Sequence, residues 1–334
     1  MTVATTDEVM APAEFERCPH IQTEEVNSCP LCGGGRHSEF AIGFDYELRT
    51  CRNAWHFVAC ASCSHVWLNP RPATAELPVI YPPHYYAYNY QSVVHPIAAW
   101  AKGVLDHGKL KGILRYCSGA PKSYLDAGCG DGRFLRAMAA RGVPRSEIHG
   151  LELDERVVAH LRAEGFQAFC ERVEDCRLPA ESIDLATMFH VIEHVDDPGA
   201  VVRGVRRCLK PGGIFAIETP NVDSWDARLF HERYWGGYHI PRHWNLFSPQ
   251  TLKRLLEQNG FEVLATEYKT GHSFWMYSLH HWLRYHGVPW PKLAQRFDPM
   301  GSLAALACFT GFDILRKSAG FRTSAMLLVA RKRA

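Results

Sequence analysis

Three glycines at alternate positions mark the most informative turn of this 334-residue sequence, in "YLDAGCGDGRF": Gly128, Gly130 and Gly132. The turn stands between a short apolar run and a helical pattern. Glycine in such a place lets a ligand approach the backbone, and the start of a helix offers free N–H donors. Glu152 closes the next apolar run, where a carboxylate can accept hydrogen bonds from both hydroxyls of a ribose. The spacing predicts a nucleoside-containing ligand.

The spacing of the glycines also separates two kinds of nucleoside cofactor. Dinucleotide-binding turns favour G-x-G-x-x-G. This turn reads G-x-G-x-G, with Asp126 two residues before the first glycine. An NAD-dependent oxidoreductase is therefore the least favoured enzyme class.

Two C-x-x-C pairs near the N-terminus have the pattern of metal ligands: Cys29, Cys32, Cys60 and Cys63. Structural zinc takes four thiolates in a tetrahedron, and each pair presents two sulfurs. A redox C-x-x-C would not occur in duplicate outside a thioredoxin-like unit. We predict a zinc-ribbon-like module with a structural Zn²⁺. Because the sequence starts without a secretory signal, its twelve cysteines indicate reduced thiols and a cytoplasmic location.

The charge of the chain gives no support to a nucleic-acid partner. The formal net charge is +2, and residues 1–72 hold nine acidic against five basic residues, which repels phosphates. No window reaches the roughly 18 apolar residues of a membrane span. The nearest approach, residues 299–315, is predicted to be a buried helix, which leaves only weak contact with a membrane surface open. The sequence does not indicate an oligomeric state.

The pattern of the chain changes at about residue 119. From there apolar strands alternate with amphipathic helices, which is typical of an α/β fold with a parallel sheet covered on both faces. We expect a disordered tail over residues 1–24, the zinc-binding module over 25–75 and a linker with a helical, aromatic lid over 76–118. The large domain, 119–334, carries insertions near 221–247 and 271–320 that we expect to cap the substrate.

Three further stretches follow the glycine turn in a fixed order: "VEDCRLPAESIDLA", "FHVIEHVDDP" and "CLKPGGIFAIETPN". With the turn, they resemble the class I, Rossmann-like S-adenosylmethionine-dependent methyltransferases over about residues 120–334. The resemblance implies a doubly wound, mostly parallel seven-stranded sheet. It also implies cofactor contacts from Asp126, Gly128, Cys129, Gly130, Gly132, Glu152, Leu153, Val173, Glu174, Phe189 and His190.

The same resemblance assigns a part of the cofactor to each position. Asp126 and the glycines would line the methionine portion, Glu152 the ribose hydroxyls and Leu153 the adenine. Val173 and Glu174 fall where relatives contact the adenine edge, and either Glu174 or Asp175 could reach the adenine amine. Phe189 and His190 would face the sulfonium.

The N-terminal half carries a resemblance of its own. "CASCSHVWLNPRP" and the Tyr-rich segment after it resemble the zinc module of a methyltransferase branch that acts on sugars and other small metabolites. The resemblance implies that the module closes over the substrate side of the cleft. Tyr86 is the aromatic residue we select to face the sulfonium, by a cation–π attraction; an aromatic hinge between domains is the alternative.

Methyl transfer to a hydroxyl or an activated carbon requires a base that takes the acceptor proton. "HERYWGGYHIPRHWNLFS", residues 231–248, holds two histidines four residues apart, His239 and His243. We predict that one is the general base, with His239 preferred. Alternatively both bond to loop backbone and steady the lid. His190 is a third candidate.

These observations predict an S-adenosylmethionine-dependent methyltransferase that acts on oxygen or carbon of a small-molecule acceptor, a sugar or secondary metabolite. Two alternatives remain open on sequence grounds. One is an RNA methyltransferase with a zinc ribbon, which the acidic N-terminal segment disfavours. The other is a non-catalytic ligand-binding scaffold, which the complete set of glycines and acids disfavours.

Overall fold

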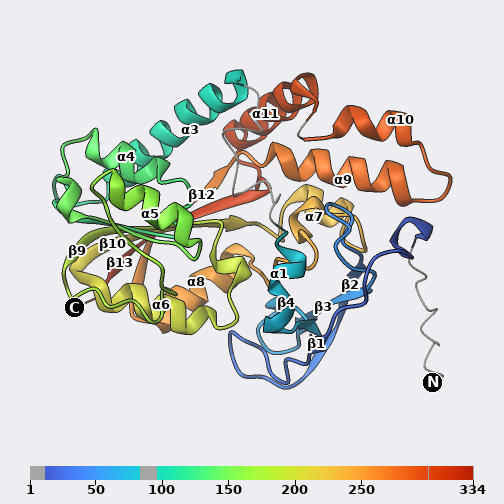
Figure 1. The fold of residues 1–334 in the computed structure, drawn as a ribbon, viewed down its shortest axis with the longest axis horizontal. Coiled ribbons are helices and arrows are strands. Elements are labelled where there is room, and N and C mark those ends of the chain that lie inside the picture. The colour runs from blue at the N-terminus through green and yellow to red at the C-terminus, as the bar shows by residue number, and fades with distance from the viewer. Residues whose placement is uncertain (1–11, 83–95, 300, 334) are drawn as a thin grey trace.

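A computed structural model describes residues 12–82, 96–299 and 301–333 (Figure 1). Its centre is a seven-stranded sheet of order β12-β13-β10-β9-β6-β7-β8 in which only β13 runs antiparallel to its neighbours. This confirms the predicted doubly wound, mostly parallel sheet. The strands are β6 (Tyr124–Ala127), β7 (Ile148–Leu151), β8 (Gln167–Phe169), β9 (Ile183–Phe189), β10 (Leu209–Pro220), β12 (Phe261–Lys269) and β13 (Ala325–Lys332).

Helices cover both faces of this sheet. The helices are α3 (Pro96–Leu114), α4 (Arg133–Ala139), α5 (Glu155–Ala163), α6 (Pro198–Cys208) and α8 (Pro249–Gln258). Strand β13 shows why two cores form, because its side chains alternate. Met326, Leu328 and Ala330 pack with α6 and α8, whereas Leu327 and Val329 pack with α3, α4 and α5. Apolar residues are therefore needed on both faces, which explains the near-continuous apolar runs.

Local signals fix the ends of the helices on one face of the sheet. Asp197 caps α6 by accepting a hydrogen bond from the Ala200 N–H at 2.8 Å, with Pro198 at the first position. Ser248 and Thr251 form a reciprocal capping box at the start of α8. Both helices therefore begin at residues whose side chains satisfy the first free N–H groups.

A second, four-stranded sheet joins the N-terminal region to the large domain. Its order is β11-β4-β3-β2, from β2 (His37–Gly43), β3 (Trp55–Cys60), β4 (Val66–Leu68) and β11 (Asn245–Leu246). Strand β11 comes from the segment after β10, some 180 residues after its partner β4. A two-stranded sheet pairs β1 (Thr23–Glu24) with β5 (Arg71–Pro72).

The N-terminal region shares its core with the segment that follows β10. One buried cluster contains Phe44, Trp55 and Phe57 together with Trp235 and Tyr238. The elements of that segment are α7 (Trp225–Leu229) and η6 (Gly236–Tyr238). The two parts therefore bury their apolar side chains against each other.

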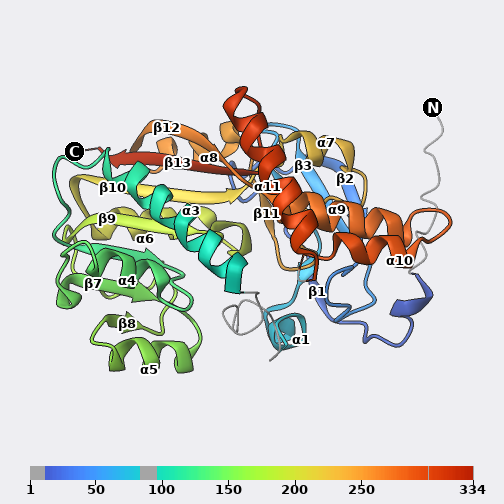
Figure 2. The ribbon, with the colours of Figure 1, turned by 90° about the horizontal axis from the view of Figure 1, so that it is seen from above.

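Two expectations need correction. Residues 12–24 belong to the expected disordered tail, yet Phe15 is fully buried against Phe44 and Tyr46. Residues 1–11 lie outside the described part. Helix α11 (Leu303–Ser318) was expected to be buried, but only Asp313 and Arg316 of it are. It packs on α9 (His272–Tyr285) in an outer layer with α10 (Pro291–Ala294) (Figure 2).

The remaining short helices lie at connections: η1 (Ala13–Phe15), η2 (Thr74–Glu76), α1 (Leu77–Ile80), η4 (Arg145–Glu147), η5 (Ile192–His194) and η7 (Gln295–Phe297). Among the described helices, none has both the length and the apolar character needed to cross a membrane.

Candidate functional site

The glycine turn lies at the carboxyl end of β6, at the edge where β7, β9 and β10 also end. The N–H groups of Gly128 and Cys129 donate to the Leu151 carbonyl at 2.9 Å, which holds the turn against β7. All three glycines have positive φ. A Cβ on Gly128 would lie 2.3 Å from Val191 and one on Gly132 2.2 Å from Leu161, so both positions require glycine.

Gly130 differs from the other two glycines because open space lies in front of it. No atom lies within 4 Å of the place that its Cβ would take. Its N–H donates to the Glu152 carboxylate at 2.9 Å, and the Leu153 N–H donates to the same group at 2.7 Å. Glu152 is therefore held over the open side of the turn, beside the 66% exposed Leu153. A backbone cradle with a fixed carboxylate fits the nucleoside half of S-adenosylmethionine.

Asp126 lies below the turn and is almost completely buried. Burial raises its pKa to about 7, although a 2.7 Å hydrogen bond from the Thr187 hydroxyl works in the other direction. The side chain of Cys129 packs against Gly150 in the same layer. These two residues support the turn from inside the sheet.

Phe189 and His190 end β9 beside the turn, as the sequence led us to expect. The Phe189 ring contacts Phe134 with 4.6 Å between centroids, and the Lys109 ammonium lies 4.7 Å from the Phe189 centroid. His190 has a positive φ of 57°, which is strained for a residue with a side chain. The Phe189 ring and the strained His190 backbone thus lie together in this corner.

A buried charge network surrounds His190. Its Nδ1 lies 3.3 Å from Glu193 and its Nε2 3.3 Å from Glu218, which also binds Lys109 at 2.6 Å. Partial burial disfavours the imidazolium, but the two carboxylates outweigh it and raise the His190 pKa to about 9. His190 is therefore protonated near pH 7, so it is a poor candidate for the base.

Three more residues were expected to contact the cofactor: Val173, Glu174 and Tyr86. Val173 is 8% exposed and its side chain belongs to the sheet core. Glu174 forms an ion pair with Arg172, which also contacts Asp196. Tyr86 lies outside the described residues.

Three histidine rings converge next to this corner: His194, His239 and His243. Their ring centroids lie 4.6, 5.0 and 6.3 Å apart. His194 Nδ1 lies 3.0 Å from the Arg242 carbonyl and His243 Nδ1 2.8 Å from the Gly237 carbonyl. Burial lowers the His194 pKa to about 4 and holds that of His243 well below its usual range. Both are neutral rings tied to backbone.

His239 differs from the other two because its partner is a carboxylate. Its Nδ1 lies 2.8 Å from Glu47, a residue of the N-terminal region, and both side chains are about 5% exposed. His239 also has a positive φ of 39°. A carboxylate beside Nδ1 orients the ring.

Arg242, between the two predicted histidines, is fully buried in an ion pair with Asp45. The guanidinium reaches both carboxylate oxygens, at 3.0 and 3.1 Å, and also the Ile80 carbonyl at 2.7 Å. This pair holds the Asp45 pKa below its usual range although burial opposes it. Asp45 and Glu47 together attach the histidine segment to the N-terminal region.

Four acidic residues of this region carry no motif that predicts them: Asp45, Glu47, Glu193 and Glu218. Asp197 caps the helix that follows, whereas Glu193 accepts a hydrogen bond from the Thr219 hydroxyl at 2.9 Å. Asp45 and Glu47 lie in "FDYELR", which has no motif. Only their position next to "HIPRH" in space identifies them.

The four cysteines of the two C-x-x-C pairs come together. Their sulfurs lie within 4.8 Å of one another, and Cys29–Cys63 and Cys32–Cys60 are each 3.6 Å apart. A tetrahedral zinc with Zn–S bonds of about 2.3 Å requires sulfurs about 3.8 Å apart. The donor set therefore fits a zinc ion. Glu193, His194 and His243 form a second group of suitable composition, but its members already bond to Thr219, His190 and backbone carbonyls.

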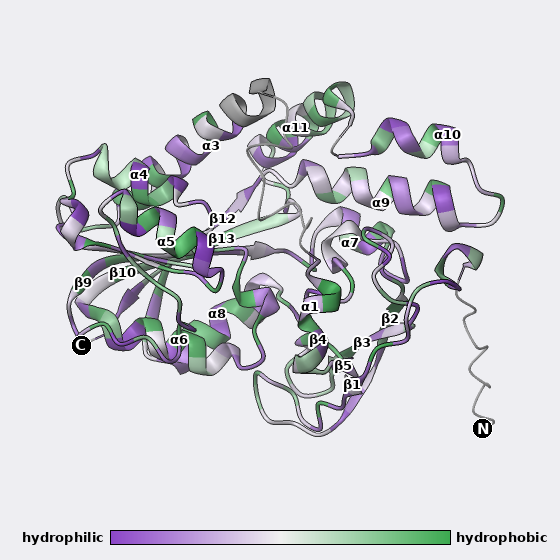
Figure 3. Ribbon diagram, viewed as in Figure 1, coloured by the Kyte–Doolittle hydropathy of each residue, from purple (hydrophilic) through white to green (hydrophobic). Residues whose placement is uncertain are grey.

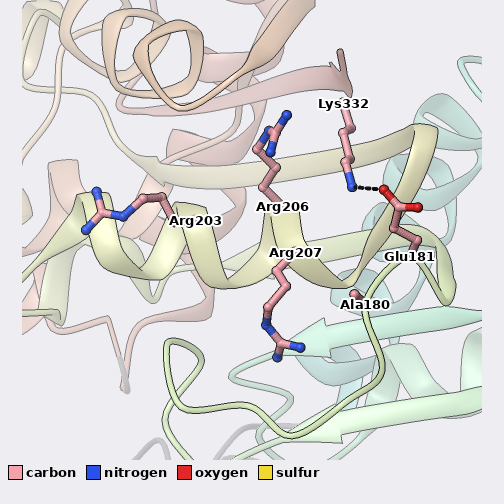
Figure 4. Close-up of a pocket in the computed structure, with 6 residues that line it drawn as sticks. All are labelled: Ala180, Glu181, Arg203, Arg206, Arg207 and Lys332. Carbon is pink, nitrogen blue, oxygen red and sulfur yellow. Dashed lines mark hydrogen bonds and ion pairs between the residues drawn. The ribbon is translucent and has the colours of Figure 1, made fainter. Parts of the chain in front are cut away.

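A cavity of about 440 Å³ lies elsewhere. It is on the outer side of α6 and is lined by Arg203, Arg206, Arg207, Lys332, Glu181 and Ala180 (Figure 4). Lys332 pairs with Glu181 there at 3.1 Å. None of these residues lies at the carboxyl ends of β6, β7, β9 or β10, so the cavity is not part of the site.

Comparison with known proteins agrees with this geometry. Residues 101–266 match the family model described as "Methyltransferase domain". A Mycolicibacterium smegmatis protein described as "Probable S-adenosylmethionine-dependent methyltransferase" is 35% identical over 46% of this chain and 56% of its own length. A Neisseria meningitidis ubiquinone biosynthesis O-methyltransferase is 30% identical over 45% of this chain and 68% of its own. The chain thus spans only part of these relatives.

A solved structure shares the fold. One chain from a complex of a Haloferax volcanii methyltransferase activator with a methyltransferase aligns with 75% of this chain and 96% of its own, at 17% identity and a TM-score of 0.50. With the glycine turn, Glu152 and the strand order, these matches lead to one conclusion. The chain belongs to the S-adenosylmethionine-dependent methyltransferase family.

Proposed function

We propose that this protein transfers a methyl group from S-adenosylmethionine to a hydroxyl oxygen of a small-molecule acceptor, a sugar or another metabolite. The observation that carries the proposal is the His239–Glu47 pair, placed one ring away from the strand ends that form the cofactor site. The O-methyltransferase named among the relatives supports oxygen as the acceptor atom. Carbon is the alternative acceptor.

The residues of the cofactor end have separate roles in this proposal. Glu152 accepts the ribose hydroxyls, Leu153 packs beside the adenine, and the N–H groups of the turn face the methionine portion. Phe189, whose ring faces the Lys109 ammonium at 4.7 Å, lies at the sulfonium end of the cofactor in this proposal. When bound, the cofactor would supply an electrophilic methyl carbon, and its sulfur would leave as a neutral thioether. Holding the reactants in line contributes most of the acceleration, roughly 7–11 kcal/mol.

His239 is the base in this proposal. Its Nε2 takes the proton of the acceptor hydroxyl, and Glu47 stabilises the imidazolium that forms. His243 has a strongly lowered pKa, and its Nδ1 lies 2.8 Å from the Gly237 carbonyl, so we assign it to positioning the loop. The low exposure of both rings keeps bulk water away from the base.

Zinc in the four-cysteine cluster has a structural role in this proposal. The cluster lies in the same region as Asp45 and Glu47, which reach the histidine segment. A structural ion supplies on the order of 10 kcal/mol to a small module. The ion therefore stabilises the fold that positions the base.

Cofactor binding is tested by calorimetry with S-adenosylmethionine. Glu152→Gln removes the charge that receives the ribose hydroxyls, and we expect a 10- to 100-fold weaker Kd, equivalent to about 1.5–3 kcal/mol. Glu155→Gln, in the first turn of α5, is the matched control and should keep the wild-type Kd. Equal affinities for all three proteins would exclude the proposed site.

The transfer step is tested by incubation with methyl-labelled cofactor and a small-metabolite extract, followed by identification of the labelled product. We expect an O-methyl product, and a loss of at least 100-fold in its rate for His239→Gln with an unchanged cofactor Kd. His190→Gln reports on the third histidine. A C-methyl product would show that the acceptor atom is carbon. Full activity of His239→Gln would show that His239 is not the base.

A further inference from the structure

Glu193, His194 and His243 bring a carboxylate and two imidazoles together beside the end of β10. One potential metal-ligand atom from each residue lies within 4.8 Å of the other two. Glu193 and His194 belong to η5, whereas His243 comes from the segment after β10. Glu193 is fully buried and His243 is 5% exposed. Tertiary structure therefore assembles this group from two segments and largely encloses it.

The backbone partners of the two histidines determine which ring nitrogen is able to bind an ion. Nδ1 of His194 lies 3.0 Å from the Arg242 carbonyl oxygen, and Nδ1 of His243 lies 2.8 Å from that of Gly237. A carbonyl oxygen has no proton to give, so each Nδ1 donates and each neutral ring keeps the lone pair of Nε2. The Tyr81 hydroxyl oxygen, 3.0 Å from the same nitrogen of His194, accepts a share of that proton. A backbone carbonyl on Nδ1 is the arrangement that orients histidine ligands of metal ions.

Glu193 supplies the negative charge of the group and keeps room for a further partner. Its oxygens accept from the Thr219 hydroxyl at 2.9 Å and lie 3.3 Å from His190 Nδ1. A carboxylate has about four lone-pair positions, so these two contacts leave capacity for an ion. The neighbourhood is partly apolar, because Tyr81, which contacts His194, follows the mainly hydrophobic helix α1 (Figure 3). Lone pairs enclosed in such surroundings cost free energy unless a donor or a cation meets them.

The donor set selects the kind of ion. Two imidazole nitrogens and one carboxylate suit Zn²⁺ and similar transition metals, whereas Mg²⁺ and Ca²⁺ prefer oxygen ligands throughout. Zn–N and Zn–O bonds of about 2.0–2.2 Å place two ligand atoms of one ion about 3.4 Å apart, inside the 4.8 Å limit that the three atoms satisfy. Within the described part of the chain, no hydrogen bond reaches Nε2 of His194 or of His243. Three protein ligands also leave a fourth position open.

We propose that Glu193, His194 and His243 bind a divalent transition-metal ion, Zn²⁺ or a similar one, in addition to the ion of the four-cysteine cluster. The open position takes a hydroxyl oxygen of the acceptor, beside His239, whose ring centroid lies 5.0 Å from that of His243. The site itself does not depend on the proposed methyl transfer. The part of the acceptor as a ligand rests on that proposed function.

The site is tested by counting ions on the full chain, by plasma mass spectrometry after equilibration with Zn²⁺ and removal of unbound metal. We expect Glu193→Gln and His243→Gln each to hold one ion fewer than the wild type. His280→Gln is the matched control and should keep the wild-type count, because His280 Nδ1 also lies 3.0 Å from a backbone carbonyl, that of Ala294. Glu193→Gln retains an oxygen for the Thr219 hydroxyl, and an unchanged circular dichroism spectrum shows that it folds. Equal counts in the wild type and in Glu193→Gln overturn the proposal, whatever the four-cysteine cluster holds.

The part of the acceptor is tested with methyl-labelled cofactor. Glu193→Gln should transfer methyl about 100-fold more slowly, because the acceptor oxygen loses the polarising ion, while the Kd for S-adenosylmethionine stays within about threefold. A full transfer rate in Glu193→Gln that has lost the ion overturns the acceptor as a ligand. A wild type that binds the ion without any methyl transfer would contradict the proposed function and leave the metal site standing.

Discussion

The proposed cofactor end and the proposed acceptor end of the site are built in different ways. At the cofactor end, the glycine turn and Glu152 lie within 30 residues of sequence, and backbone hydrogen bonds to Leu151 fix their geometry. At the acceptor end, His239 and Arg242 depend on Glu47 and Asp45, which precede them by 192 and 197 residues. The first end is local, and the second is assembled from distant segments.

The two ends therefore owe their stability to different interactions. The cofactor end inherits its rigidity from the sheet, whose strands are buried on both faces. The acceptor end relies on a core shared by the N-terminal region and the segment after β10, and on buried ion pairs. We therefore expect substitutions in the N-terminal region to damage the acceptor end first.

The largest effect should come from loss of the metal. Cys60→Ser removes one thiolate, and we expect the zinc content to fall and the acceptor end to unfold, a loss on the order of 10 kcal/mol. Metal analysis and near-ultraviolet circular dichroism measure this. The Kd for S-adenosylmethionine should stay within about threefold. Cys170→Ser is the control, and a simultaneous loss of cofactor binding would show that the two ends are one unit.

The next largest effect concerns the buried ion pair. Arg242→Met leaves Asp45 charged without its partner, and we expect a loss of about 3–5 kcal/mol in the free energy of unfolding, measured in urea. Arg203→Met removes a side chain that is 61% exposed and 3.8 Å from Asp197, and should cost less than about 1 kcal/mol. Equal losses in the free energy of unfolding for Arg242→Met and Arg203→Met would mean that the Arg242–Asp45 ion pair does not stabilise the acceptor end.

At the cofactor end, Asp126 should make stability depend on pH. Its pKa is raised from 3.8 to about 7, so the folded protein binds the proton more tightly than the unfolded chain. Its contribution is complete below pH 3.8 and is lost as the pH rises to about 7, by a few kcal/mol at about 1.4 kcal/mol per pKa unit. Urea unfolding of ligand-free Asp126→Asn should lack this slope. Asp175→Asn, at an exposed position, should keep it.

The smallest effect tests the adenine contact. Leu153→Ala removes a side chain that is 66% exposed, so the free energy of unfolding should not change measurably. We expect S-adenosylmethionine to bind up to tenfold more weakly, about 1 kcal/mol, measured by calorimetry. Leu229→Ala, at a 60% exposed leucine on α7, should leave the Kd unchanged. An unchanged Kd for both variants would place the adenine elsewhere.

Much of the fold could be predicted because its signals are local. Strand periodicity, the caps at Asp197 and Ser248 and the glycine turn all act within a few residues. The expected burial of α11 was wrong. An apolar sequence indicates that a helix face favours contact with other apolar groups, but it does not show whether the same chain supplies them. The expected tail was wrong for Phe15, because its buried position depends on Phe44 and Tyr285.

The sequence by itself determined the sheet, the glycine turn with Glu152 and the four cysteines, since each depends on short-range spacing that backbone geometry makes unique. Only the tertiary structure decided that His239 has a carboxylate partner, that β11 joins the sheet of the N-terminal region, and that Arg242 is buried. These features require segments nearly 200 residues apart to meet. Such contacts are selected by packing and by the cost of burying an unpaired charge, which no local pattern records.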